Sequence, residues 1–248
     1  PGVPRRAPLA SLRPEPPPVK LPRDEAAELI LLQNALDAYT NRRLSIVEGA
    51  ADPGALGRTP LATRAKLRDA RLAIPGLLED FARENPFGLD ARLLDVARGY
   101  RHAVGGRLLV ERTLKSHAIL VSTDEAGPVY AVLGVTQSVG ELVALGPIGR
   151  PPVLVDVVLL PWRGRIVWDG IVSTVTIHLG SGIRRSFADA YLRAKERGQV
   201  VTTLGPQPAV ASRTPRPARD GRRRSRRRWR PQTRWASSRR NLAGPVSA

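Results

Sequence analysis

The residues best suited to bind a ligand by charge are the arginines of residues 212–248. This segment holds 13 Arg and one acid, Asp220, so its net charge is +12. Guanidinium groups neutralise nucleic-acid phosphates and release counterions, which gives an affinity that falls steeply with salt. Trp229 and Trp235 lie among these arginines, and indole rings can stack on unpaired bases. The pattern therefore predicts binding to RNA or other single-stranded nucleic acid.

The residues that this hypothesis assigns to nucleic acid form one short run: Arg222, Arg223, Arg224, Arg226, Arg227, Arg228, Trp229, Arg230 and Trp235. No motif that reads a duplex groove accompanies them. Two other interpretations stay open. The segment could be a solvated tail that adheres to any polyanion. It could also be a stretch of GC-rich DNA read out of frame, which encodes Arg, Pro, Ser, Ala and Trp with little Lys.

A second candidate site is the glycine-rich junction at residues 180–185. Gly180, Ser181 and Gly182 follow a predicted strand and open a predicted helix, and Arg184 and Arg185 come directly after them. Free backbone amides and the positive end of the helix dipole favour an anion at such a place. The junction lacks the third Gly of a dinucleotide fingerprint and the Lys-Ser/Thr of a P-loop. A tight turn with a positive φ at glycine is the simpler interpretation.

An enzyme would need an acid, a base or a nucleophile near that junction. Asp169 is a candidate general base, and Asp156 is a carboxylate within an apolar run, where burial can perturb a pKa. Asp169 is equally well explained as a turn residue. His102, His117 and His178 are too scattered for a metal-binding spacing. Cys is absent and no Ser stands in a G-x-S-x-G elbow, so we assign no catalytic residue, metal or cofactor.

The first hundred residues carry helical patterns. Apolar residues at spacings of three and four predict a helix from residue 24 to about 46. Thr59-Pro60 is a helix start signal, because proline at the first helical position needs no amide donor. Two further helical segments are predicted at residues 76–84 and about 90–100.

After Gly105-Gly106 the apolar period becomes that of strands. Three short segments, residues 107–113, 117–122 and 129–135, are predicted strands separated by turn residues. Residues 153–160 are apolar on both faces apart from Asp156, as expected for a central strand.

A turn follows this central strand, and then a return strand at residues 165–168. A tight bend is predicted at Asp169-Gly170, a strand at residues 171–179 and a helix at residues 183–197. We therefore expect an α+β fold, in which N-terminal helices precede a mainly antiparallel sheet with one late helix.

Composition divides the chain into three parts. We expect a disordered Pro-rich leader at residues 1–22, a single α+β domain at residues 23–205 and a disordered Arg-rich tail at residues 206–248. The longest apolar run is far shorter than the roughly 20 residues of a membrane span. We therefore expect a soluble, cytoplasmic protein without a membrane partner.

Two segments resemble a signature of uncharacterised bacterial proteins. They are VYAVLG at residues 129–134 and LLPWRGRIVWDG at residues 159–170. The signature places a V-Y-x-V-x-G strand before an L-L-P-aromatic-x-G-x-I-x-x-D-G hairpin. The resemblance covers about residues 24–205 and implies a bacterial origin, but it implies no established activity and no catalytic residue.

Three functions remain after these observations. The first is a non-enzymatic binding protein whose basic tail contacts nucleic acid. The second is an enzyme or a binder of small anions at the junction of Gly180, Ser181, Gly182, Arg184 and Arg185, acting with Asp169. The third is a protein-interaction module with an inert tail, and a homodimer stays open as a further kind of partner.

Overall fold

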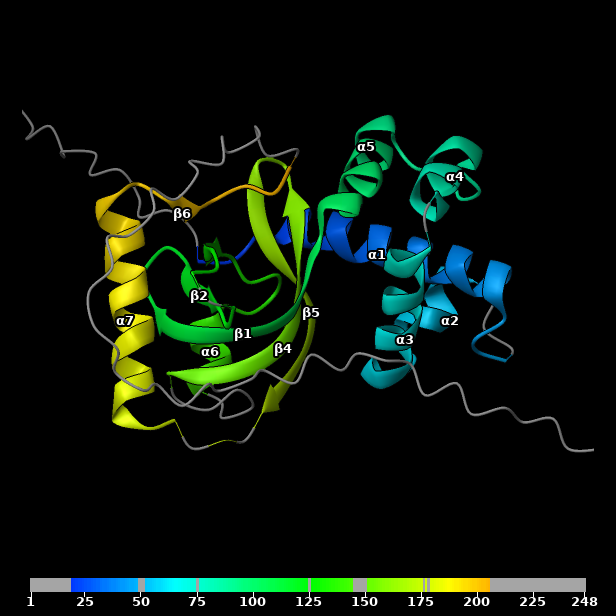
Figure 1. The fold of residues 1–248 in the computed structure, drawn as a ribbon. Coiled ribbons are helices and arrows are strands. Elements are labelled where there is room, and N and C mark those ends of the chain that lie inside the picture. The colour runs from blue at the N-terminus through cyan, green and yellow to red at the C-terminus, as the bar shows by residue number, and fades with distance from the viewer. Residues whose placement is uncertain are drawn as a thin grey trace, which may run out of the picture. The chain divides into compact units, whose positions relative to one another are not determined.

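The computed structural model describes residues 19–48, 52–74, 76–124, 126–144, 151–175, 177 and 179–205. Residue contacts divide the chain into two compact units, Pro1–Pro208 and Ala209–Ala248, and the described residues all lie in the first. None of the helices in these ranges is long and apolar enough to cross a membrane. The fold is α+β, as the sequence predicts: helices come first, then a sheet and a late helix (Figure 1).

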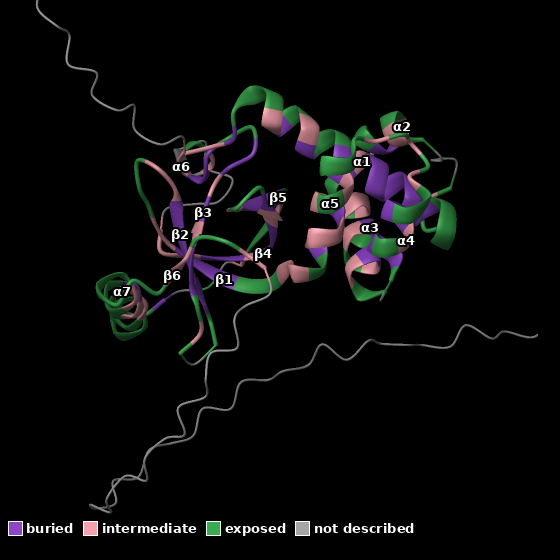
Figure 2. Ribbon diagram, turned by 90° about the horizontal axis from the view of Figure 1, so that it is seen from above, coloured by how far each residue is buried: buried purple, intermediate pink, exposed green. Residues whose placement is uncertain are grey.

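The N-terminal half is a group of helices. Their bounds are α1 Arg23–Leu44, α2 Pro53–Gly57, α3 Leu61–Ala73, α4 Leu77–Glu84, α5 Ala91–Gly99 and the 3-10 helix η1 Tyr100–His102. Side-chain caps start two of them, because Asp52 accepts a hydrogen bond from the amide of Ala55 and Asp90 from the amide of Arg92. The predicted apolar stripe of α1 is buried against α4 and α5 in the main core (Figure 2).

The second half is a six-stranded sheet in the order β5-β4-β1-β2-β3-β6. The strands are β1 Val104–Thr113, β2 Ala118–Ser122, β3 Val129–Val132, β4 Val153–Trp162, β5 Arg165–Val175 and β6 Val200–Val201. Helix α6, Val139–Ala144, lies between β3 and β4 in sequence, and α7, Ser181–Glu196, precedes β6. All strand pairs are antiparallel except β3 with β6, so the sheet is mainly antiparallel, as predicted.

The sheet closes on itself after β3. Leu133 pairs in parallel with Val167 of β5, through hydrogen bonds of 2.9 Å from the Leu133 amide to the Ile166 carbonyl and 3.4 Å from the Trp168 amide to the Leu133 carbonyl. Strands β1 to β5 therefore form a small barrel in the circular order β1-β2-β3-β5-β4, with a short helix after the third strand. This strand order is that of an OB-type Greek-key barrel. The contact also joins residues 129–134 to residues 159–170.

Both sides of β2 are buried, by different partners. Ala118 and Leu120 pack in the main core together with Val132, Val155 and other barrel residues. Ile119 and Val121 alternate with them and pack outside the barrel, against α7. This double burial explains the continuous apolar run of β2.

The predicted bend at Asp169-Gly170 is wrong. One strand, β5, runs through these residues from Arg165 to Val175, and β4 stays paired with it on both sides of an irregularity. Leu159 opposes Trp168 whereas Val157 opposes Val172, so β5 carries extra residues there and bulges. Gly170 adopts a positive φ of 83°. Glycine is favoured at a positive φ both in a bulge and in a turn, so Asp-Gly in the sequence does not distinguish the two.

Candidate nucleic-acid interface

The predicted nucleic-acid-binding residues from Arg222 to Trp235 lie outside the residues that the structure describes. The structure does describe the chain that leads to them, through α7 and β6 up to residue 205. The candidate interface is therefore built here from α7, the last helix before the Arg-rich segment.

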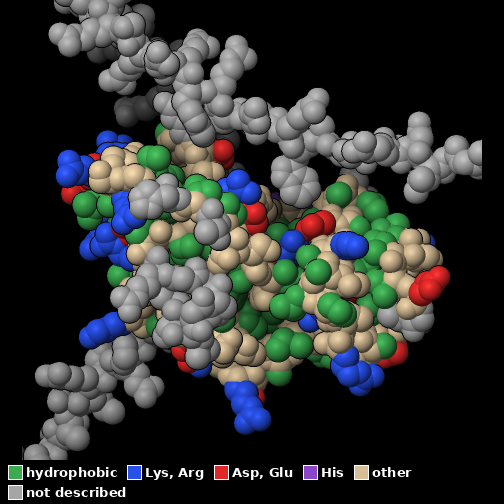
Figure 3. All heavy atoms as spheres, turned by 90° about the horizontal axis from the view of Figure 1, so that it is seen from below, with side chains coloured by type: hydrophobic (Ala, Val, Ile, Leu, Met, Phe, Trp, Pro, Cys, Tyr) green, Lys and Arg blue, Asp and Glu red, His purple; other side chains and the backbone are tan. Residues whose placement is uncertain are grey.

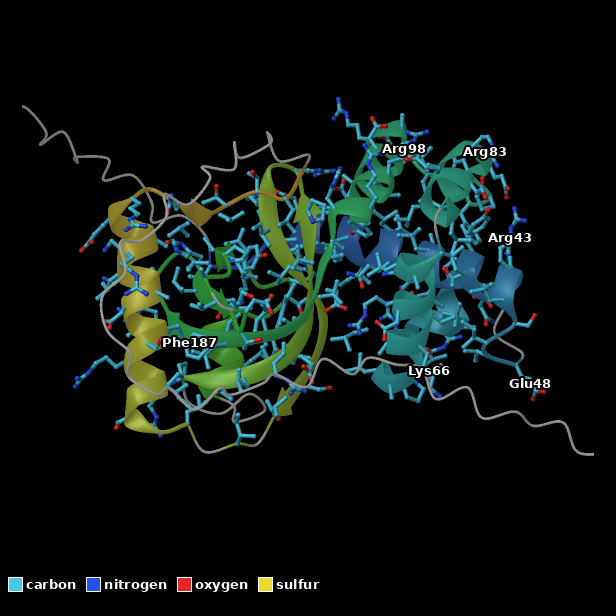
Figure 4. All side chains as sticks on the ribbon, viewed as in Figure 1. Arg43, Glu48, Lys66, Arg83, Arg98 and Phe187 are labelled. Carbon is cyan, nitrogen blue, oxygen red and sulfur yellow. The ribbon has the colours of Figure 1, made fainter. Side chains whose placement is uncertain are left out.

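Helix α7 is held on the barrel by one apolar stripe. Tyr191 is buried, and Phe187, Ala190 and Ala194 are partly buried beside it, over Ile119, Val121 and Val129. Phe187 points from α7 toward the sheet (Figure 4). The Arg112 guanidinium lies 4.7 Å from the ring centroid of Tyr191 and fixes the same side of the helix to β1. The helix therefore covers the outer face of β2 and β3.

The remaining surface of α7 is exposed (Figure 2), and it carries more cations than acids. Helix α7 and its C-terminal cap residue Arg197 carry five exposed cations, of which Arg184 is bonded to the Leu179 carbonyl; we call the other four, Arg185, Arg193, Lys195 and Arg197, the α7 basic face. Lys and Arg side chains gather at the left-hand side of Figure 3, where Figure 1 places α7. Asp189 and Glu196 are the acids of this helix, yet among the described residues no ion pair includes an α7 side chain.

The glycine-rich junction lies at the start of α7, with Gly180, Ser181, Gly182, Arg184 and Arg185 all exposed. Gly180 has φ −62° and ψ 157°, so the predicted turn with a positive φ at this glycine is wrong. The Arg184 Nε donates a 2.8 Å hydrogen bond to the carbonyl of Leu179, the residue directly before Gly180. This guanidinium therefore has an intramolecular role, and anion binding at the junction stays a prediction.

Replacing Gly180 with Ala is expected to change the free energy of unfolding by less than about 0.5 kcal/mol. Its backbone is extended and an added Cβ would meet no atom within 4 Å. Gly170 is the matched control, because its Cβ would also meet open space but its φ is 83°. Gly170→Ala should cost about 1–2 kcal/mol for the left-handed backbone. Urea unfolding of both variants checks this, and equal losses would contradict the extended geometry of Gly180.

Asp169 is not brought to the junction. Its carboxylate is buried at the bulge of β5 and accepts hydrogen bonds from Arg68 Nη1 at 2.5 Å and from the Ile171 amide at 3.1 Å. Burial raises the pKa of Asp169, and the charges of Arg68 and Arg71 oppose this rise only in part. The second acid, Asp156, forms a bidentate pair of 3.0 and 3.1 Å with Arg107 at the surface, across β1 and β4.

The raised pKa of Asp169 has a defined sign for stability. The folded state holds the proton of this carboxyl more tightly than the unfolded state, so the contribution of Asp169 to folding weakens as pH rises above its ordinary value of 3.8 and levels off above the folded pKa. As pH rises from 3.8 to the folded pKa of Asp169, the unchanged protein should therefore lose unfolding free energy relative to the Asp169→Asn variant. Urea unfolding across a pH series measures the difference, and a shift in the opposite direction would contradict the burial argument.

Sequence reasoning missed a buried polar cluster between the helices and the barrel. One side of α3 carries three arginines, Arg64, Arg68 and Arg71. Asp37 of α1 accepts hydrogen bonds from Arg64 Nε, at 3.0 Å, and from Arg71. Arg68 donates to Asp169. The Arg71 Nε and the Tyr100 hydroxyl are buried in this region without a hydrogen-bond partner. The sequence signal for this cluster was the spacing of its three arginines, which are four and three residues apart on a helix with few apolar residues.

The described residues contain no group of three or more His, Asp or Glu that could hold a metal ion. The ring of His117 lies 2.8 Å from the Ser116 hydroxyl, and burial lowers its pKa, while His178 lies outside the described residues. The described residues line two hollows of note. One is a cavity of about 80 Å³ between β1, β2 and α6, and the other is an open groove of about 540 Å³ lined by Glu28, Arg92, Asp95, Val96 and Arg163.

Comparisons with protein-family models, with curated proteins and with solved structures found no match to this chain.

Proposed function

We propose that this protein is a non-enzymatic nucleic-acid-binding protein that holds RNA or single-stranded DNA through its Arg-rich C-terminal segment. The observation that carries the proposal is the charge of residues 212–248, with 13 Arg, one acid and two Trp. Each guanidinium bound to a phosphate releases a counterion. Stacking on Trp229 and Trp235 would favour unpaired bases.

The aromatic side chains of the described residues support the assignment of base stacking to Trp229 and Trp235 and not to the barrel. Those of the barrel and α7, such as Tyr130, Trp162, Trp168 and Tyr191, are buried, and Phe187 is partly buried. A base needs an exposed ring on which to stack. Within the chain, Trp229 and Trp235 are therefore the rings we assign to this role.

The barrel does not offer an alternative nucleic-acid site by analogy. OB-type barrels bind oligonucleotides on the outer face of their second and third strands. Here α7 covers Ile119, Val121 and Val129 on that face. A topology alone also carries no function, so the proposal depends on the basic segment.

The rival enzyme hypothesis needs Asp169 and the Gly180 junction to act together. The hydrogen bonds of Asp169 are to Arg68 and to the Ile171 amide, and Arg184 donates to Leu179. The interaction-module hypothesis needs a continuous apolar patch. Of the most exposed large apolar side chains, Leu31 lies on α1, Leu61 on α3 and Ile183 on α7, and Ile177 lies between β5 and α7.

The test is direct binding of the full chain to an unstructured RNA and to single-stranded DNA across a salt series. The logarithm of the association constant should fall linearly with the logarithm of salt concentration, with a loss of about 300-fold to 10⁴-fold in affinity between about 50 and 200 mM if six to ten phosphates of a single strand are contacted. Binding that does not depend on salt, or no binding at low salt, would exclude the proposal.

A further inference from the structure

The sheet has two terminal strands, β5 and β6, and their outer edges differ. Strand β6 holds only two residues, which leaves little edge for another strand. Strand β5 is longer, and Leu133 closes only its first half, at Val167. Beyond the bulge, residues 172–175 pair with β4 on one side, and no strand in the described part of the chain pairs with them on the other. We call the outer side of residues 171–175 the open β5 edge.

The open β5 edge lacks the features that keep sheet edges apart. Residues 171–177 read IVSTVTI, with six β-branched residues and no charge, Pro or Gly. β-branched side chains favour strand pairing, whereas a charge or a proline on an edge discourages it. Ser173 and Thr174 are exposed, and Ile177, directly beyond the strand, is 54% exposed. Such an edge is a template for a further strand.

A second copy of this chain fits the open β5 edge. Any strand can pair antiparallel with a copy of itself about a two-fold axis, since the contact is then the same for both partners. The chain carries a net charge of +18, so two copies meet most favourably where the surface has no unpaired charge. The nearest charged residue across β4 is Asp156, which lies opposite Ser173 and is neutralised by Arg107 of β1.

We propose that the protein forms a homodimer in which the open β5 edges of two copies pair antiparallel across a two-fold axis. Ser173, the middle residue of 171–175, lies opposite its counterpart in the second copy. Val172 then faces the counterpart of Thr174, and Ile171 that of Val175, so β-branched side chains pair across the axis. The contact involves five residues of each strand. An interface of this size gives a weak dimer that depends on concentration.

The first test is analytical ultracentrifugation of the nuclease-treated full chain from about 1 µM to about 1 mM. The dimer fraction should rise with concentration, and it should rise further with salt, which screens the repulsion between the positively charged copies. A dimer bridged by residual nucleic acid would weaken with salt instead. Thr174→Lys puts a charge on the edge and should weaken association by at least about tenfold. The control Ser186→Lys adds the same charge at an exposed residue of α7 and should not.

The absence of Cys from the chain allows a second test, of the register. Directly opposed residues of antiparallel strands have Cα atoms about 4.5–5.5 Å apart, which lies within the range of a disulfide. Ser173→Cys should therefore give a disulfide-linked dimer on mild oxidation. Ser186→Cys, which is also exposed, should cross-link far more slowly. This test does not require Thr174→Lys to fold, and circular dichroism verifies the folding of each variant.

Three outcomes would overturn the proposal. The first is a chain that stays monomeric over the whole concentration range. The second is a dimer that Thr174→Lys leaves unchanged. The third is cross-linking of Ser186→Cys as fast as that of Ser173→Cys, because the copies would then meet at another surface. The dimer does not rest on the proposed function, and neither test uses a nucleic acid, so the two proposals fail separately.

Discussion

Replacing Arg222, Arg223, Arg224, Arg226, Arg227 and Arg228 with Gln is expected to weaken RNA binding by at least about 100-fold at physiological salt. Each phosphate contact on a single strand contributes about 0.7 units to the salt slope, so the loss of six contacts should lower the slope by about four units. Fluorescence anisotropy with an unstructured RNA across a salt series measures both quantities.

The matched control replaces the same six arginines with Lys. Lysine keeps the charge and still binds phosphate as a point charge. The slope should therefore stay near that of the unchanged chain, although the affinity can fall by a smaller factor. An equal loss in both variants would show that counterion release by these positions is not the source of the affinity.

Replacing Asp37 with Ala is expected to lower the free energy of unfolding by about 3–5 kcal/mol. Asp37 is buried and neutralises two arginines of α3, Arg64 at 3.0 Å and the buried Arg71. Without the carboxylate, Arg71 would keep its charge in a region that water does not reach. Urea unfolding followed by circular dichroism gives the difference.

Asp156→Ala is the control for this prediction. Its two oxygens also accept hydrogen bonds, in this case both from Arg107, but the two side chains are about half exposed. A pair at the surface contributes about 0–1 kcal/mol, because water and salt screen it. Similar losses in the two variants would show that burial does not set the contribution of the Asp37 cluster.

The sequence predicted the elements that position the candidate interface. The strand at residues 153–160 was predicted as central, and β4 lies between β1 and β5. Apolar residues on both of its faces gave this information. The late helix was predicted to turn Ile183, Phe187, Ala190, Tyr191 and Ala194 inward. The last four do pack on the barrel, whereas Ile183 is 51% exposed.

Other features could not be predicted, because their signals have two meanings. Asp-Gly marks both a turn and a bulge, so the continuation of β5 through Asp169 depends on the pairing with β4. The three arginines of α3 look like surface residues in an Arg-rich chain. Their burial depends on Asp37 and Asp169, which lie far away in sequence.

The lack of ion pairs on α7 within the described residues is likewise invisible in the sequence. Asp189 lies four residues after Arg185, a spacing that favours an ion pair on a helix. In the structure these two residues do not pair within the described part of the chain. Knowledge of the side-chain positions was therefore needed to identify the α7 basic face.

The central claim is that the folded part and the Arg-rich segment bind nucleic acid together. The most direct measurement compares residues 1–248 with a chain that ends at Pro206, using RNA and single-stranded DNA across a salt series. We predict that the short chain binds weakly but measurably, and that the segment adds affinity with a steeper salt slope. No binding by the short chain at low salt, while the full chain binds, would contradict the claim and leave the segment as the whole source of affinity.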